Sequence, residues 1–152
     1  MPIDVAARVI ANRPLSSEYN VLSLSAPAIA AVAAPGQFVM LKARSGDNPL
    51  LRRPFSVFEV LRDEDGAVTG LSILSKRIGA STSLLYDARD GQRIDCLGPL
   101  GRPFTVVAPP SEAWMIAGGV GLAPFATLAQ ALRASGVTST LFYGARRAEE
   151  LF

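Results

Sequence analysis

The chain has 152 residues, of which 49% are hydrophobic and 18% charged, which is the composition of a globular protein with a core. A formal net charge of only +2, with scattered basic residues, is too small to argue for a nucleic-acid-binding protein, and we expect no nucleic-acid partner. No apolar run approaches the roughly 20 residues of a membrane span, and the N-terminus lacks a signal-peptide pattern, so we expect neither.

The cysteine and histidine content narrows the chemistry further. One cysteine, Cys96, excludes an internal disulfide framework and is typical of a protein of the reducing cytoplasm. The chain contains no histidine, and it therefore lacks the commonest general base and the usual zinc ligand. We expect no metal site, and any reaction should depend on a bound cofactor.

The first 108 residues are predicted to form a β domain. Short runs rich in β-branched and aromatic residues alternate with segments that contain Gly, Pro, Asn or Asp. Six strands at this spacing favour a small antiparallel barrel over an open sheet. A short helix is expected within residues 79–91, capped by Ser81 or Thr82. The expected strands are 5–12, 19–26, 36–43, 53–60, 68–75 and 91–98.

Residues 109–152 follow a different pattern. After Pro109 and Pro110, a buried strand at 114–119, an Ala- and Leu-rich helix at 120–136 and a second strand at 138–146 form a βαβ unit. This unit is expected to begin a parallel α/β domain that stops after two strands, with a further helix starting at 146–152. An apolar helix side that should seek a partner, either a second copy or a companion subunit, is made of Val120, Leu122, Phe125, Leu128 and Leu132.

A glycine-rich turn joins the first strand of this unit to its helix. Glycines in such a turn let backbone N–H groups approach a phosphate, and the helix N-terminus adds partial positive charge. A tight turn with no ligand is the alternative, and the spacing departs from the usual dinucleotide fingerprint. The residues of the candidate site are Gly118, Gly119, Gly121 and Pro124.

The start of the strand at 53–60 carries unusual residues for a buried strand. Arg53 offers a planar fork for a phosphate, Phe55 a flat apolar face, and Ser56 a hydroxyl. Pro54 removes one N–H from the ladder, so the strand should lie at an edge there. Together these groups suit a flavin dinucleotide, while an edge strand with solvated arginines is the alternative. Arg52 should be ordinary surface.

Several motifs occur together and in order along the whole chain. They are "GQFVML", "LLRRPFSV", "LSKRIGASTSLL", "LGPLGRPF", "AGGVGLAPF" and "FYGAR". In this combination the chain resembles the ferredoxin reductase-like flavoproteins, and most of all the electron-transfer subunit of the heterotetrameric, NAD-linked dihydroorotate dehydrogenase. The resemblance implies an FAD-binding antiparallel barrel followed by a nicotinamide-binding α/β domain, which is incomplete here.

The resemblance also implies roles for individual residues. Arg53 would hold the FAD pyrophosphate, Phe55 would lie against the isoalloxazine, and Ser56 would hydrogen-bond near its reactive nitrogen, the one catalytic assignment. The further FAD-binding residues implied are Pro54, Leu74, Ser75, Lys76, Gly79, Ser81 and Thr82.

The implied activity is electron transfer between NAD(H) and a catalytic subunit that oxidises dihydroorotate, in pyrimidine biosynthesis. Full-length relatives would carry a [2Fe–2S] centre, but Cys96 alone cannot supply its four ligands and is expected to be a small buried hydrophobe. Arg146 and Arg147 leave NAD and NADP open. We expect this chain alone to turn over NADH poorly. The alternatives are a free-standing NAD(P)H-dependent ferredoxin or flavin reductase, a sulfide dehydrogenase-type subunit, and a non-catalytic FAD-holding interaction module.

Overall fold

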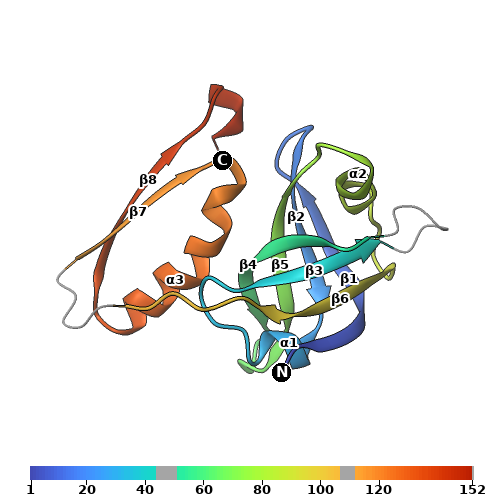
Figure 1. Cartoon of the computed structure of the whole chain (residues 1–152), viewed down its shortest axis with the longest axis horizontal. Helices are drawn as coiled ribbons and strands as arrows, with labels where there is room; N and C mark the ends of the chain where they lie inside the picture. Colours follow the sequence, from blue (N-terminus) through green and yellow to red (C-terminus); the bar gives the residue numbers. More distant parts are fainter. Residues whose placement is uncertain (44–50, 107–111, 152) are drawn as a thin grey trace.

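A closed six-stranded antiparallel barrel forms the larger part of the molecule. A computed structural model describes residues 1–43, 51–106 and 112–151. The barrel strands follow the order β1-β2-β5-β4-β3-β6, and the barrel stands beside a smaller layer of two strands and one helix (Figure 1). The predicted barrel is thus confirmed. Its strands are β1 (Ile3–Pro14), β2 (Tyr19–Ser25), β3 (Phe38–Ala43), β4 (Arg53–Arg62), β5 (Val68–Lys76) and β6 (Arg93–Leu100).

The barrel core consists of the apolar residues that alternate with polar ones along the predicted strands. Leu22 on β2 lies opposite Ile73 on β5, and Leu24 lies opposite Leu71. All four side chains are fully buried, because successive residues of a strand point to opposite faces and these share the inward face. Cys96 on β6 belongs to the same core, as expected of a small buried hydrophobe.

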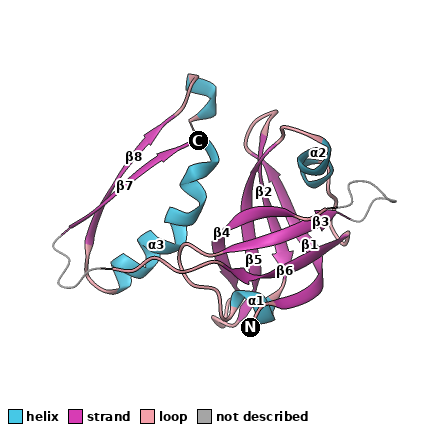
Figure 2. Cartoon of the chain, in the orientation of Figure 1, coloured by secondary structure: helices cyan, strands magenta, loops and turns pink. Residues whose placement is uncertain are grey.

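Two short helices close the ends of the barrel (Figure 2). Helix α1 (Pro27–Ala30), which the sequence does not predict, buries Ile29 and contributes it to the core. Helix α2 (Ala80–Tyr86) is tied to the barrel by Asn12, whose Nδ2 donates to carbonyl oxygens at the end of that helix. The acceptors are Leu85 at 3.2 Å, Tyr86 at 2.8 Å and Ala88 at 2.9 Å.

The predicted βαβ unit is confirmed. Strands β7 and β8 pair in parallel, with Trp114 opposite Thr140 and Ile116 opposite Phe142. The predicted boundary at residue 109, with Pro109 and Pro110, lies outside the described residues. The expected final helix is only a single 3₁₀ turn. The elements are β7 (Glu112–Gly118), η1 (Gly119–Leu122), α3 (Ala123–Ala134), β8 (Thr138–Gly144) and η2 (Ala148–Glu150).

Helix α3 lies between the barrel and the two-stranded sheet (Figure 1). Val21 and Leu74, on the outer face of the barrel, form a buried apolar cluster with Ala123 at the start of α3. Phe58 and Leu122 pack against this cluster. Burial of these apolar side chains therefore holds the helix against the barrel wall.

This packing corrects the prediction that the apolar side of the helix needs a partner. Leu132 is buried, and among the helix residues named above only Val120 is classed as exposed. The uncovered apolar surface lies instead on the sheet face that points away from α3. Trp114, Ile116 and Phe142 are 68%, 75% and 48% exposed there. No helix in the described residues is long and apolar enough to cross a bilayer.

Candidate functional site

One cavity of about 700 Å³ gathers most of the residues predicted to bind a cofactor. Four segments form its walls: the start of β4, the end of β5, the entry to α2, and the η1–α3 turn. These segments are far apart in the sequence, and the barrel closure together with the docking of α3 brings them together. The lining residues are Arg53, Pro54, Phe55, Ser56, Leu74, Ser75, Lys76, Ile78, Gly79, Ala80, Ser81, Thr82, Val120 and Ala123.

The cavity lies where β4 and β5 stop pairing with each other. Their ladder begins at Val57 and Ile73. In the described part of the chain, residues 53–56 pair with β3 alone and residues 74–76 with β2 alone. The missing N–H of Pro54 therefore falls on an edge, as the sequence predicts. The separation of the two strands leaves their ends facing a shared space.

The β4 side of the cavity combines a cation with an apolar wall. Arg53 and Pro54 are exposed, whereas Phe55 is half-buried and packs against the barrel core. Arg52, predicted to be ordinary surface, instead places Nη2 2.9 Å from both carboxylate oxygens of Asp4, and its side chain is 25% exposed. Of the two neighbouring arginines, Arg53 lines the cavity, whereas Arg52 forms an ion pair with Asp4 on β1 of the barrel.

The entry to α2 differs from the expected cap. Gly79, not Ser81 or Thr82, is the N-cap residue, because the helix begins at Ala80. Thr82 still organises the turn: its Oγ1 accepts from the N–H of Ile78 at 2.9 Å and of Gly79 at 3.0 Å, and its hydroxyl donates to the Gly79 carbonyl at 3.0 Å. One threonine hydroxyl thus fixes the backbone that forms this wall.

The glycine-rich turn reaches the cavity through its apolar neighbours. Val120 and Ala123 line the wall, whereas the predicted residues Gly118, Gly119, Gly121 and Pro124 do not. The sequence therefore predicts that the turn lies at the cavity, but it does not predict that Val120 and Ala123 are the residues of the turn that line it. Ile78 and Ala80 also line the cavity and were not predicted. Both lie within the "LSKRIGAST" motif, so a prediction that included every residue of the motif would have contained them.

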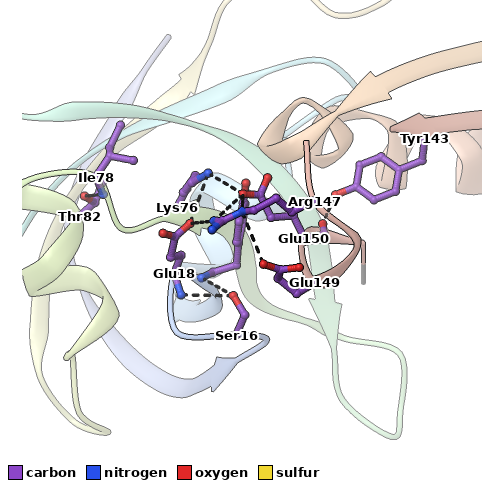
Figure 3. Close-up of polar contacts among 10 residues, drawn as sticks. Ser16, Glu18, Lys76, Ile78, Thr82, Tyr143, Arg147, Glu149 and Glu150 are labelled. Atoms are coloured by element: carbon purple, nitrogen blue, oxygen red, sulfur yellow. Dashed lines mark hydrogen bonds and ion pairs between the residues drawn. The ribbon is translucent and has the colours of Figure 1, made fainter. Parts of the chain in front are cut away.

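An ion network lies beside the cavity, around Lys76 (Figure 3). Lys76 Nζ is 3.4 Å from Glu18 Oε2 and 3.6 Å from Glu150 Oε1, and it lies 4.9 Å from the ring centre of Tyr19. Arg147, considered above for nucleotide selection, places Nη2 2.9 Å from Glu150 Oε1 and 3.5 Å from Glu18 Oε2. In this structure Arg147 is therefore engaged with carboxylates.

The charges of the network hold one another ionised. A hydrogen bond from Arg147, followed by the charges of Lys76 and Arg147, lowers the pKa of Glu150, although partial desolvation opposes this. The pKa of Lys76 is raised, first by its hydrogen bond with Tyr19 and then by the charge of Glu150, again against desolvation. Both groups are charged at neutral pH.

Sequence comparison identifies relatives along nearly the whole chain. No family model matches it. The electron-transfer subunit of dihydroorotate dehydrogenase B (NAD(+)) from Desulforamulus reducens is 36% identical over 140 residues, which are 92% of this chain and 52% of that protein. The subunit of the same name from a Geobacillus species is 34% identical over 146 residues, covering 95% and 55%. The chain spans about half the length of these curated relatives.

Solved structures share the fold. A ferredoxin reductase of carbazole 1,9a-dioxygenase has a TM-score of 0.83 at 25% identity, covering 98% of this chain and 44% of that one. A ferredoxin NADP+ reductase from Neisseria gonorrhoeae, solved with bound FAD and NADP, has a TM-score of 0.78 at 18% identity, covering 97% and 60%.

The barrel, the docked βαβ unit and the cavity between them define a ferredoxin reductase-like protein. Within this class, the sequence is similar to dihydroorotate dehydrogenase B electron-transfer subunits over 92–95% of its own length.

Proposed function

We propose that this chain binds FAD in the cavity and carries electrons between NAD(H) and the dihydroorotate-oxidising subunit of a type B dihydroorotate dehydrogenase. The observation that supports this proposal is the convergence of three separate motifs, at 53–56, 74–76 and 79–82, on one cavity. The names of the relatives support the assignment to electron transfer and to a partner subunit.

The cavity fits a flavin dinucleotide in size and chemistry. Its volume of about 700 Å³ lies within the range of small-molecule sites. The Arg53 guanidinium offers paired donors to a pyrophosphate, and Phe55 and Leu74 offer apolar surface to a ring system. Ser56 supplies a hydroxyl that can donate or accept at the ring edge. A ferredoxin NADP+ reductase of the same fold has been solved with both FAD and NADP bound, which supports the proposal.

Bound FAD would supply redox chemistry that no side chain of this chain can provide, accepting two electrons at once and releasing them singly. The residues of the chain bind and orient. Arg53 neutralises phosphate charge, and the Thr82 hydroxyl holds the backbone of the facing wall. Val120 and Ala123 form the wall of the cavity beside the glycine-rich turn.

The decisive experiment is an FAD titration of the purified chain, followed by absorption spectra before and after desalting. We expect visible flavin bands that survive desalting. Arg53→Ala should weaken binding by about 10-fold to 100-fold, because a charge-assisted hydrogen bond is lost. Arg62→Ala is the matched control: it removes the same charge from the other end of β4, where Arg62 binds the Gly66 carbonyl at 2.8 Å.

Two outcomes would overturn the proposal. A protein that is colourless after incubation with excess FAD and desalting would exclude stable flavin binding by this chain. Equal losses in both arginine variants would exclude a specific role for Arg53. The partner is tested separately, by co-elution of the FAD-loaded chain with a dihydroorotate-oxidising subunit during gel filtration.

A further inference from the structure

The glycine-rich turn is held in place from two sides. Gly119 has a φ of +53°, and a Cβ added there would lie 3.4 Å from the phenol oxygen of Tyr19 on the barrel. From β8, the Tyr143 hydroxyl donates to the Gly119 carbonyl at 3.5 Å and to the Glu150 carbonyl at 3.3 Å. The turn therefore lies against a barrel residue, and one tyrosine links it to η2.

The ion network connects the same two parts of the molecule. Glu18 lies between β1 and β2, and Lys76 ends β5, so both belong to the barrel. Arg147 and Glu150 belong to the segment after β8. Figure 3 shows these four side chains meeting at one point, with the charges alternating between cation and carboxylate. Tyr19 lies beneath Lys76 and close to Gly119, so the network and the turn share a neighbour on the barrel.

The burial of the network distinguishes it from an ordinary surface pair. The Glu150 side chain is 8% exposed and that of Lys76 is 29% exposed, whereas the neighbouring Glu149 is 69% exposed. Isolated exposed pairs contribute little, but a carboxylate withdrawn from water depends on its partners. Glu150, the least exposed charge of the network, is therefore the group whose loss of partners should have the largest effect on the local structure.

We propose that Glu150 and Lys76 are positioning residues: their ion pair holds the Gly119–Leu122 turn against the barrel, so that Val120 and Ala123 form the fourth wall of the cavity. A displaced turn would open the cavity on one side and should weaken FAD binding. This consequence for FAD rests on the proposed function. The positioning itself can be measured without any ligand.

Glu150→Gln is the informative variant, because Glu150 lies outside the cavity lining and the amide keeps its shape. Glu149→Gln is the matched control, with the same exchange one residue away on a side chain that contacts Arg147 at 3.6 Å and is exposed. Lys76→Met removes the other partner. Lys76→Arg retains the charge and should restore the wild-type behaviour.

The measurement is hydrogen exchange of the backbone amides of residues 118–123 in the ligand-free chain. We expect about threefold or faster exchange there in Glu150→Gln and Lys76→Met, with no change in Glu149→Gln. The double variant should accelerate exchange by less than the two single effects combined, since both substitutions remove the shared Lys76–Glu150 pair. Salt at about 1 M should bring the wild type towards the variants.

The same variants separate this inference from the proposed function. If FAD binds the wild type and Glu150→Gln weakens binding several-fold while the turn exchanges faster, both are supported. If neither the wild type nor the variants bind FAD but the turn exchanges faster in the variants, positioning holds and the flavin proposal fails. Unchanged exchange at 118–123, or equal acceleration throughout the barrel strands, would overturn the positioning role.

Discussion

Phe104 stacks on Phe125, with ring centres 5.9 Å apart and ring planes inclined by 16°. Phe104 belongs to the segment that leaves β6, and Phe125 to the first turn of α3. The Phe104 ring also lies against Gly36, where an added Cβ would come within 2.8 Å of it. One aromatic side chain thus joins the barrel, the connecting segment and the helix.

Phe104→Ala should loosen this junction. Loss of the half-exposed ring should lower the free energy of unfolding by about 1–2 kcal/mol, measured by denaturant titration. Phe142→Ala is the control, because Phe142 meets Trp114 edge-on, 5.7 Å between centres, on the outward sheet face. A loss below about 1 kcal/mol is expected there. Equal losses would show that the Phe104 contact does not join the two parts.

Thr82→Val should disturb the wall of the cavity at α2. The substitution keeps the volume but removes the acceptor of the Ile78 and Gly79 N–H groups, which should cost about 1 kcal/mol. FAD affinity should fall in parallel, whereas Thr82→Ser should retain both properties. A Thr82→Val protein with wild-type stability would mean that water replaces the hydroxyl at no cost.

The fold was largely predictable because its signals are local. Alternation of apolar residues defined the six barrel strands, and Gly, Pro and Asp marked most of the turns between them. The parallel unit followed from a buried strand, an apolar helix and a second buried strand. Helix α1 was missed because its four residues are too few to show a helical period.

The site was predictable only where a motif is contiguous. The local chemistry of residues 53–56 and the family resemblance of residues 79–82 were enough to select two segments that line one cavity. Glu18, Lys76 and Glu150 meet only through the docking of the second layer, and no local pattern relates them. Asn12 likewise contacts residues more than 70 positions away. Such long-range pairs follow from tertiary packing rather than from propensity.

The buried thiol of Cys96 should make stability depend on alkaline pH. Burial raises its pKa from 9.0 to about 12, with Arg52 opposing and Asp4 adding to the effect. Above pH 9 the unfolded thiol loses its proton while the folded thiol keeps it, so the unfolded state gains stability. The contribution of Cys96 should be constant below pH 9 and fall by about 1.4 kcal/mol per unit towards pH 12.

The measurement is the free energy of unfolding of wild type and Cys96→Ala as a function of pH. Because other groups titrate alike in both proteins, the difference between the two curves isolates the thiol. That difference should narrow or reverse as the pH rises above 9, as the wild type loses its advantage. Parallel curves, or rapid reaction of the native protein with a thiol reagent at neutral pH, would show that Cys96 is accessible.

The outward face of the β7–β8 sheet should bind apolar dyes and promote self-association when the chain is isolated from other proteins. Trp114 and Ile116 expose apolar surface side by side with Phe142, and contiguous patches of this kind bind apolar dyes and promote association. Ile116→Thr should therefore reduce dye fluorescence and concentration-dependent light scattering while leaving stability nearly unchanged, because threonine is compatible with a strand. Leu132→Thr makes a comparable exchange at a buried position of α3 and should cost about 2–4 kcal/mol. If Ile116→Thr were as destabilising as Leu132→Thr, the sheet face would be covered in solution, and the monomeric arrangement with an open face would be wrong.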